Sequence, residues 1–318
     1  MKYRRCGRSG ILLPEISLGL WHNFSEAESY EKSRDIILAA YDRGITHFDL
    51  ADNYGPPPGS AERTFGRVLR EQLGAHRDQI LVTTKAGHPM WDGVYGDWAS
   101  RKHLMAGIDQ SLGRLGLDYV DIFYSHRYDP STPLEETMRT LDHIVRSGRA
   151  LYAGLSKYPS DKLSEALRML RELGTPALVN QLSYSMLNRD PERSQFDVNR
   201  RNGIGCVSFS PLAQGMLTDR YLDGIPEDSR AAKEHGFLQV YQVEENIDRV
   251  RALKEIADQR GEPLAQMALA WQLTDDRVTS VIVGVSSVRQ LETNLGALDS
   301  APFTAEQLET IDKITPKL

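Results

Sequence analysis

The chain alternates between short apolar runs and longer segments of helical period. Eight runs rich in β-branched and aromatic residues predict strands over 16–19, 47–50, 80–85, 120–124, 151–156, 177–181, 205–209 and 280–283. Amphipathic segments follow them and predict helices over 33–43, 61–71, 102–115, 134–147, 161–173, 243–259, 264–274 and 288–298, with a weaker helix over 197–202. Glycines at 44, 148 and 174 stand where the left-handed residue after a helix is favoured.

This repeated strand-helix unit predicts an α/β fold, a (β/α)8 or TIM barrel of about 250 residues. We expect a single domain over 1–318, in which residues 1–14 form a hairpin that closes the barrel bottom and 305–315 form a C-terminal helix. The alternative is an open doubly wound sheet with a second domain. Its GxGxxG signature after a strand is missing, because Gly203-Ile204-Gly205 precedes a strand.

The composition of the chain limits the kinds of partner that we expect it to bind. Lys and Arg number 38 against 44 Asp and Glu, so the net charge of −6 argues against a surface built for nucleic acid or anionic lipid. Cys6 and Cys206 form no metal or disulfide spacing, and no apolar run approaches the length of a membrane helix. We expect a cytoplasmic protein with no membrane, nucleic-acid or metal partner.

The chemistry of such barrels lies at the carboxyl ends of the strands. Asp49 ends the second predicted strand and Tyr54 follows in its loop, while Lys85 ends the third strand and His126 follows the fourth. We expect these four side chains to converge. Tyr54 would protonate a carbonyl oxygen, with its pKa lowered by the ammonium of Lys85. Asp49 would hold Lys85, and His126 would orient the carbonyl or relay a proton.

Simpler interpretations stand beside this one. Asp52 is best interpreted as a turn or helix-capping residue, and His47 as a side chain that fills the barrel or pairs internally. The aromatic loop 91–98 either packs under itself or forms a wall of the substrate pocket.

At this point the sequence resembles the aldo-keto reductase family over nearly its whole length. The motifs are GITHFD (44–49) with Tyr54-Gly55, TK (84–85), VD (120–121) leading to His126, GLS (154–156), NQ (180–181), SPL (210–212) and QL (290–291) with Asn294. Segments 17–24, 53–62 and 211–215 are most similar to the branch that contains bacterial L-glyceraldehyde 3-phosphate reductases and the potassium-channel β subunits. The family's catalytic tetrad falls on Asp49, Tyr54, Lys85 and His126 without substitution.

The resemblance implies NADPH/NADP+ as cofactor. Its contacts would fall on Trp21, Asp49, Ser156, Lys157, Gln181, Phe209, Ser210, Pro211, Leu212, Ala213, Gln214, Arg220, Arg230, Gly284, Ser286, Gln290 and Asn294. Phe209 would support the nicotinamide and the two arginines would suit the pyrophosphate. With Ser286 and Gln290, Arg289 would favour the 2′-phosphate of NADPH over NADH. Two positions depart from the pattern: Lys157 stands where many relatives have Asn or Arg, and Thr293 replaces a Glu that contacts the adenine.

The activity implied is reduction of small aldehydes or ketones, such as L-glyceraldehyde 3-phosphate or methylglyoxal-like substrates. Candidate substrate contacts are His22, Trp91, Tyr95, Trp98, Arg101 and Arg127. The resemblance also allows a homo-oligomer, a tetramer or an octamer. One alternative is an NADP-binding regulatory subunit with little turnover, against which His126 argues because the channel relatives carry Asn there. The other is a metal-dependent hydrolase, disfavoured by scattered histidines and no HxH.

Overall fold

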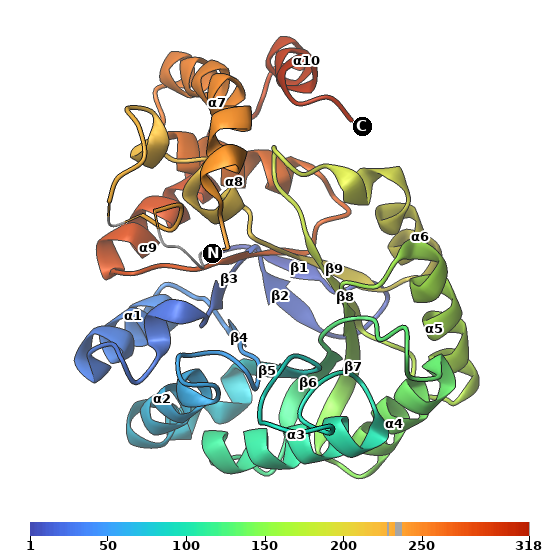
Figure 1. The fold of residues 1–318 in the computed structure, drawn as a ribbon. Helices are drawn as coiled ribbons and strands as arrows, with labels where there is room; N and C mark the ends of the chain where they lie inside the picture. Colours follow the sequence, from blue (N-terminus) through green and yellow to red (C-terminus); the bar gives the residue numbers. More distant parts are fainter. Residues whose placement is uncertain (228, 233–236, 318) are drawn as a thin grey trace.

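Eight parallel strands close into a barrel in a computed structural model that describes residues 1–227, 229–232 and 237–317. The strands are β3 (Ile16–Gly19), β4 (His47–Asp49), β5 (Leu81–Ala86), β6 (Val120–Ser125), β7 (Ala150–Ser156), β8 (Val179–Ser183), β9 (Gly205–Phe209) and β10 (Ser280–Val283). They pair in chain order and β10 closes the ring by pairing with β3, as Val281 opposite Ile16 shows. The expected (β/α)8 barrel is confirmed (Figure 1).

Helices surround the strands (Figure 1). They are α1 (Tyr30–Asp42), α2 (Ser60–Val68), α3 (Arg101–Leu115), α4 (Leu134–Arg146), α5 (Ser160–Glu172), α6 (Gln195–Asn202), α7 (Val240–Arg260), α8 (Leu264–Thr274), α9 (Val288–Leu295) and α10 (Ala305–Ile314). All the expected helices are present, with ends shifted by a few residues. Helix α1 begins early because the Ser29 side chain accepts a hydrogen bond from the Lys32 amide. The last turn expected of α2 is instead a π-helical segment, Leu69–Leu73.

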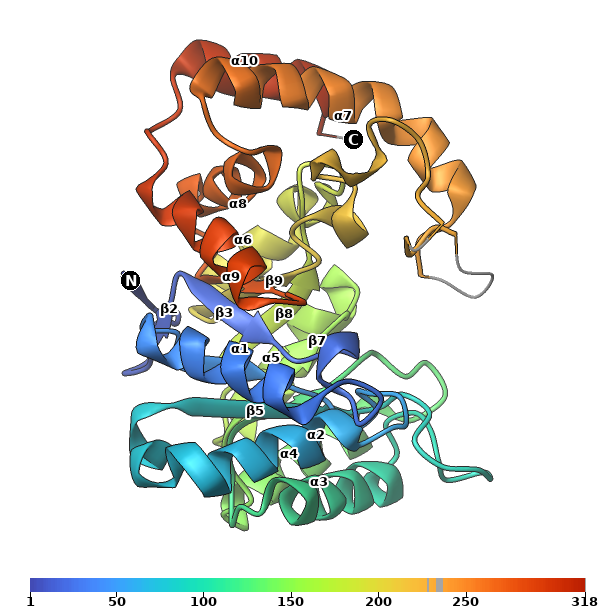
Figure 2. The same ribbon diagram turned by 90° about the vertical axis from the view of Figure 1, so that its left-hand side faces the viewer.

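The N-terminal hairpin closes the bottom of the barrel, as expected. Strand β1 (Tyr3–Arg5) pairs antiparallel with β2 (Leu12–Pro14), and the amide of Arg8 donates to the Gly203 carbonyl just before β9 (2.8 Å). Cys6 packs so closely that a Cβ at Gly205 would lie 2.3 Å from its sulfur. In Figure 2 this hairpin lies at the left, where the strands begin, and the loop between β5 and α3 projects on the opposite side.

The barrel interior is tightly filled. The ring of Tyr124 occupies the space beside Gly154, where a Cβ would lie 2.5 Å from it, so only glycine fits at that point of β7. His47 is fully buried, with Nδ1 2.8 Å from the Ser17 hydroxyl and Nε2 3.3 Å from the Thr83 hydroxyl. The interpretation of His47 as an internally paired residue is confirmed.

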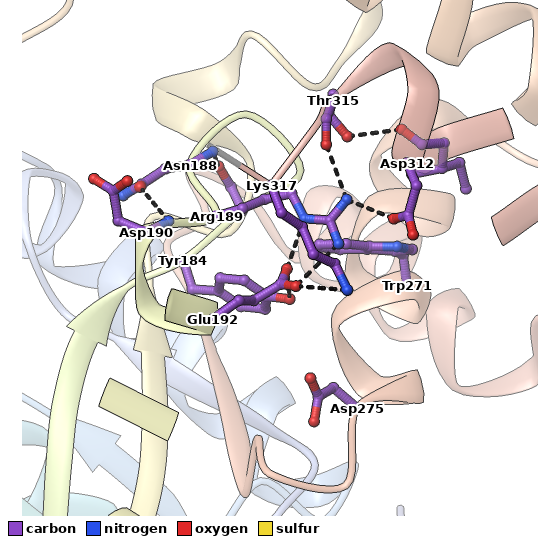
Figure 3. A network of polar contacts seen from close by, with 12 residues as sticks. Tyr184, Asn188, Arg189, Asp190, Glu192, Trp271, Asp275, Asp312, Thr315 and Lys317 are labelled. Atoms are coloured by element: carbon purple, nitrogen blue, oxygen red, sulfur yellow. Dashed lines mark hydrogen bonds and ion pairs between the residues drawn. The ribbon is translucent and has the colours of Figure 1, made fainter. Parts of the chain in front are cut away.

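Helices α7 and α10 pack side by side outside the barrel (Figure 2). The C-terminal segment is tied to the loop after β8 through Arg189, which is buried (Figure 3). Its guanidinium donates to Glu192 (2.6 Å), to Asp312 on α10 (2.6 Å) and to the Thr315 carbonyl (2.9 Å). The guanidinium also lies 5.2 Å from the ring centre of Trp271 on α8. One side chain therefore joins three distant segments. No helix of the described residues is long and apolar enough to cross a membrane.

Replacing Arg189 with Ala should destabilise the fold by about 3 kcal/mol, because it leaves the buried Glu192 carboxylate without its main partner. Urea unfolding followed by circular dichroism measures this change. The control is Arg168→Ala, which removes an exposed ion pair with Glu172 on α5 and should change the free energy of unfolding by less than about 1 kcal/mol. Equal effects of the two substitutions would contradict the role given to Arg189.

Protonation of His47 should destabilise the protein in acid. Burial, followed by the charges of Asp49 and Lys85, sets its pKa at about 4, below the value near 6.5 expected of the unfolded chain. Between these values the unfolded chain binds a proton that the native protein does not, so the free energy of unfolding falls as pH drops from about 6.5 towards 4. The variant His47→Gln should show a shallower dependence over this range. The exposed His143→Gln should keep the wild-type slope.

Candidate functional site

A buried ion pair lies at the carboxyl end of β4 and β5. The Lys85 ammonium donates to Asp49 Oδ2 (2.6 Å) and to the Leu50 carbonyl (2.5 Å). Asp49 Oδ1 accepts from the Thr83 hydroxyl (2.9 Å) and from the Gln181 side-chain amide on β8 (2.9 Å). Both charged side chains are almost completely buried, so each depends on these partners for solvation.

Tyr54 lies over this pair. The loop after β4 positions it through hydrogen bonds of its amide to the Ala51 carbonyl (3.1 Å) and of its carbonyl to the Ala61 amide (3.3 Å). The Lys85 nitrogen lies 5.0 Å from the centre of its ring, and the ring of His126 lies 5.9 Å away. Protein atoms enclose most of the Tyr54 side chain, although part of it reaches solvent, and no side chain of the described residues forms a hydrogen bond with its hydroxyl. The hydroxyl is therefore available to a ligand.

The pKa of Tyr54 shifts in the direction opposite to the one expected. Burial, with the carboxylates of Asp49 and Asp52 as further causes, raises this pKa well above its ordinary value of 10. The charge of Lys85 does not outweigh these causes, because its ammonium already pairs with Asp49 and donates to the Leu50 carbonyl. The phenol therefore keeps its proton at neutral pH.

His126 completes the group of four. Its amide donates to the Ala86 carbonyl at the end of β5 (2.9 Å), and its side chain is buried. Burial, followed by the positive charges of Lys85 and Lys157, holds its pKa well below 6.5, so the imidazole is neutral. Its Nδ1 has no hydrogen-bond partner among the described residues. The structure thus brings the four predicted residues together around one point.

Asp52 lies in a turn, as expected, but it does not cap a helix, and that part of the expectation is wrong. The next helix, α2, begins after Gly59, too far along the chain for Asp52 to cap it. Instead the loop turns inward, and both carboxyl oxygens of Asp52 are buried without a hydrogen-bond partner in the described part of the chain. Burial, with Glu62 as the next cause, raises its pKa well above 3.8. The burial of a side chain eight residues before a helix has no signal in the sequence.

Trp21 and His22 follow β3 at the same end of the barrel. Their rings lie 3.8 Å apart, and Phe237 contacts the Trp21 ring at 4.8 Å. The Trp21 ring is 6.3 Å from that of Tyr54, and the Arg230 guanidinium lies 5.9 Å from it. These two predicted residues therefore border the Tyr54 site.

The segment after β9 carries seven of the seventeen predicted cofactor residues. Ser210, Ala213 and Gln214 all have positive φ angles, 54°, 46° and 60°, which non-glycine residues adopt at a cost and mostly at functional sites. Gln214 donates to the Ser210 hydroxyl (3.2 Å) and accepts from Arg230 (2.6 Å). Arg220 lies nearby in a short 3₁₀ turn, Asp219–Tyr221. The backbone of this loop is held in one shape by its own side chains.

A cavity of about 320 Å³ lies between this loop and α9. It is lined by Leu212, Thr218, Asp219, Pro263, Leu264, Ala265, Ser287, Arg289, Gln290, Thr293 and Asn294. The Nδ2 atom of Asn294 is buried and has no partner among the described residues, so a donor is free for a ligand. Gln290 accepts from the Ser286 amide (2.7 Å) and orders the turn that follows β10 and Gly284. An apolar wall with arginine and amide donors fits the adenosine part of a dinucleotide.

Closer to Tyr54, the strand ends of β7 and β9 complete this region. The hydroxyl of Ser156 is buried and has no partner in the described residues. Phe209 ends β9, and the Lys157 nitrogen lies 5.5 Å from the centre of its ring. Pro211 accepts a hydrogen bond from Gln272 through its carbonyl (3.2 Å). Together with the free Asn294 amide, these groups supply polar and aromatic contacts of the kind that a nicotinamide dinucleotide would need.

The predicted substrate contacts in and around the loop between β5 and α3 fall into two groups, according to what they pack against. The ring of Trp91 packs on His103 (4.8 Å), and Lys102 lies 5.3 Å from the Tyr95 ring, so these two aromatics contact α3. Trp98 instead lies under the guanidinium of Arg127 (3.8 Å). Arg127 donates to the Gly87 carbonyl (2.7 Å) and pairs with Asp97 (2.5 Å). At the start of α3, the Arg101 amide donates to the Glu136 carboxylate on α4 (2.9 Å).

His88 belongs to this site although the sequence did not single it out. Its ring meets that of His126 edge-on at 4.5 Å, and its Nε2 lies 3.3 Å from the Lys157 nitrogen. A usable signal existed, because His88 follows Lys85 by three residues at a strand end. No group of three or more His, Cys, Asp and Glu side chains suited to a metal ion occurs among residues 1–227, 229–232 and 237–317.

Comparison with known proteins identifies the family of this chain. The profile of the Aldo/keto reductase family matches residues 15–316. The chain is 52% identical to the L-glyceraldehyde 3-phosphate reductase of Escherichia coli (strain K12), over 98% of this chain and 92% of that protein. It is 35% identical to a protein named "Probable voltage-gated potassium channel subunit beta" from Arabidopsis thaliana, over 100% and 98% of the two chains. The chain belongs to the aldo/keto reductase family.

Proposed function

We propose that this protein is an NADPH-dependent reductase of short aldehydes and ketones, with glyceraldehyde 3-phosphate or methylglyoxal-like carbonyls as substrates. The observation that carries the proposal is the Tyr54 hydroxyl, which has no side-chain hydrogen-bond partner among the described residues. Its ring centre lies 5.0 Å from the nitrogen of the buried Lys85 and 5.9 Å from the ring of His126. The printed name of the Escherichia coli relative supports the substrate class. Members of the family generally use NADH or NADPH, which agrees with the donors around the cavity beside α9.

In this mechanism the side chains prepare a proton transfer. Bound NADPH supplies the hydride for the carbonyl carbon. Tyr54 donates its proton to the carbonyl oxygen, and the high pKa caused by burial ensures that the proton is present beforehand. The ammonium of Lys85, held by Asp49, stabilises the phenolate that remains. The neutral imidazole of His126 can donate one N–H to the carbonyl oxygen and orient it.

Purified protein should oxidise NADPH in the presence of glyceraldehyde 3-phosphate or methylglyoxal, and Tyr54→Phe should lower kcat by about 100- to 10,000-fold, the usual contribution of a general acid. The dissociation constant for NADPH, measured by fluorescence, should stay within about twofold, since the phenyl ring remains. The control is Tyr41→Phe, which loses only a surface hydrogen bond to Gln79. An unchanged kcat in Tyr54→Phe would refute the mechanism.

Slow single turnover of the wild-type protein, without release of the oxidised cofactor, would instead indicate the alternative, an NADP-binding regulatory subunit. This alternative is worth testing because two of the relatives are named as potassium channel subunits and not as reductases.

The preference for NADPH depends on Arg289 in this proposal, because the side chain lines the cavity on α9 and would pair with the 2′-phosphate. Arg289→Ala should weaken NADPH binding about tenfold, the value of one charge-assisted hydrogen bond, and leave NADH binding nearly unchanged. Fluorescence titration with each cofactor measures both constants. Arg139→Ala, an exposed arginine on α4, serves as control. An equal loss of affinity for NADPH and NADH would show that Arg289 does not contact the 2′-phosphate.

A further inference from the structure

Two residues outside the tetrad extend the site away from Tyr54. His88 follows β5 and Lys157 follows β7, so both lie at the carboxyl end of the barrel. The Lys157 nitrogen contacts His88 Nε2 at 3.3 Å, and the His88 ring packs edge-on against His126. His126 in turn neighbours Tyr54. The four side chains form a continuous row, with the proton donor at one end and an ammonium group at the other.

The charge at the far end of this row is not balanced by the protein. Three cationic side chains act on His126, and two of them have carboxylate partners: Lys85 pairs with Asp49, and Arg127 pairs with Asp97. Lys157 forms no ion pair with any carboxylate among the described residues. The Lys157 side chain is exposed at the end of the barrel. Desolvation by the surrounding protein, followed by the charges of Lys85 and Arg127, lowers its pKa to about 8, so it is still mostly charged at neutral pH.

His88 prepares this ammonium for a ligand. Burial is the first cause that lowers its pKa, to about 4, and the charge of Lys157 is the second, so the imidazole is neutral. A neutral Nε2 accepts one hydrogen from Lys157 and leaves two N–H groups of the ammonium free to donate. The backbone of Lys157 is also held at φ 56°, a conformation that costs free energy in a non-glycine residue.

The anionic parts of the cofactor do not account for this charge. The donors suited to its phosphates are Arg230 beside the loop after β9 and Arg289 on α9. Lys157 lies instead beside Phe209, where the proposed nicotinamide would rest, and a reduced nicotinamide carries no negative charge. An anion that faces Lys157 therefore comes from the substrate.

We propose that Lys157, held by His88, binds the distal phosphate of a short phosphorylated aldehyde while its carbonyl group faces Tyr54 and His126. The inference deepens the proposed reductase function and depends on it for the identity of the carbonyl. It makes Lys157 and His88 specificity-determining residues that separate phosphorylated from unphosphorylated aldehydes of the same length.

The test compares kcat/KM for glyceraldehyde 3-phosphate with kcat/KM for glyceraldehyde. In Lys157→Met the ratio of the two should fall about 10- to 100-fold, the loss of one or two charge-assisted hydrogen bonds. Lys157→Arg, which keeps the charge, should restore most of the ratio. His88→Phe should lower it in the same direction but less, since the ammonium remains. The control is Lys162→Met, an exposed lysine of α5 paired with Glu165, which should keep the wild-type ratio.

A second readout does not depend on turnover. Inorganic phosphate is titrated calorimetrically into wild type and Lys157→Met, each saturated with NADPH so that the cofactor's own phosphate sites are filled. Weaker phosphate binding in the variant supports the inference. If the wild type reduces no carbonyl, the reductase function fails and this titration alone decides the anion site. Equal phosphate binding by wild type and Lys157→Met would overturn the inference. So would an equal loss of kcat/KM for both aldehydes in Lys157→Met together with weaker NADPH binding, which would show that Lys157 binds the cofactor instead.

Discussion

The buried pair of Lys85 and Asp49 is the interaction on which the site depends. Two opposite charges removed from water are stable only when their remaining hydrogen-bonding capacity is met. Here the Leu50 carbonyl accepts from the ammonium, and Thr83 and Gln181 donate to the carboxylate, so strands β4, β5 and β8 all contribute. The closed barrel is what brings these strand ends to one point, and the pair in turn fixes the floor beneath Tyr54.

The electrostatic environment of Tyr54, on one side of the Lys85–Asp49 pair, differs from that of His126 on the other. Burial and the carboxyl groups of Asp49 and Asp52 oppose ionisation of Tyr54. On the other side, burial, followed by the charges of Lys85 and Lys157, holds the pKa of His126 well below its ordinary value and keeps the imidazole neutral. The net charge of −6 conceals this arrangement, because a whole-chain sum says nothing about which charges face a cavity. An acidic protein can therefore present a locally cationic site to an anionic ligand.

In the proposed function, the architecture separates the residues of the proton transfer from those of cofactor recognition. The tetrad comes from β4, β5, β6 and their loops, whereas the cavity beside α9 is formed by the segment after β9 and by the first turns of α9. Ser210 and Gln214, whose φ angles are positive, belong to this segment after β9. Long loops at one end of a rigid barrel permit this division, since the strands hold both regions in place while loop residues vary.

Hydrophobic periodicity determined the order of strands and helices, and hence which polar residues stand at strand ends. Because parallel strands of a barrel all point the same way, this was enough to bring Asp49, Tyr54, Lys85 and His126 together. Glycine and capping patterns placed helix ends only within a few residues, because caps such as Ser29 depend on side-chain hydrogen bonds.

Only the tertiary structure decided the charge states. The expected lowering of the Tyr54 pKa was wrong because it considered the Lys85 charge without the partners that neutralise it. The inward turn of Asp52, the contact of His88 with Lys157 and the position of Arg189 between three segments are likewise absent from any local pattern. Burial and through-space distance control these properties, and both arise only when residues far apart in the chain are packed together.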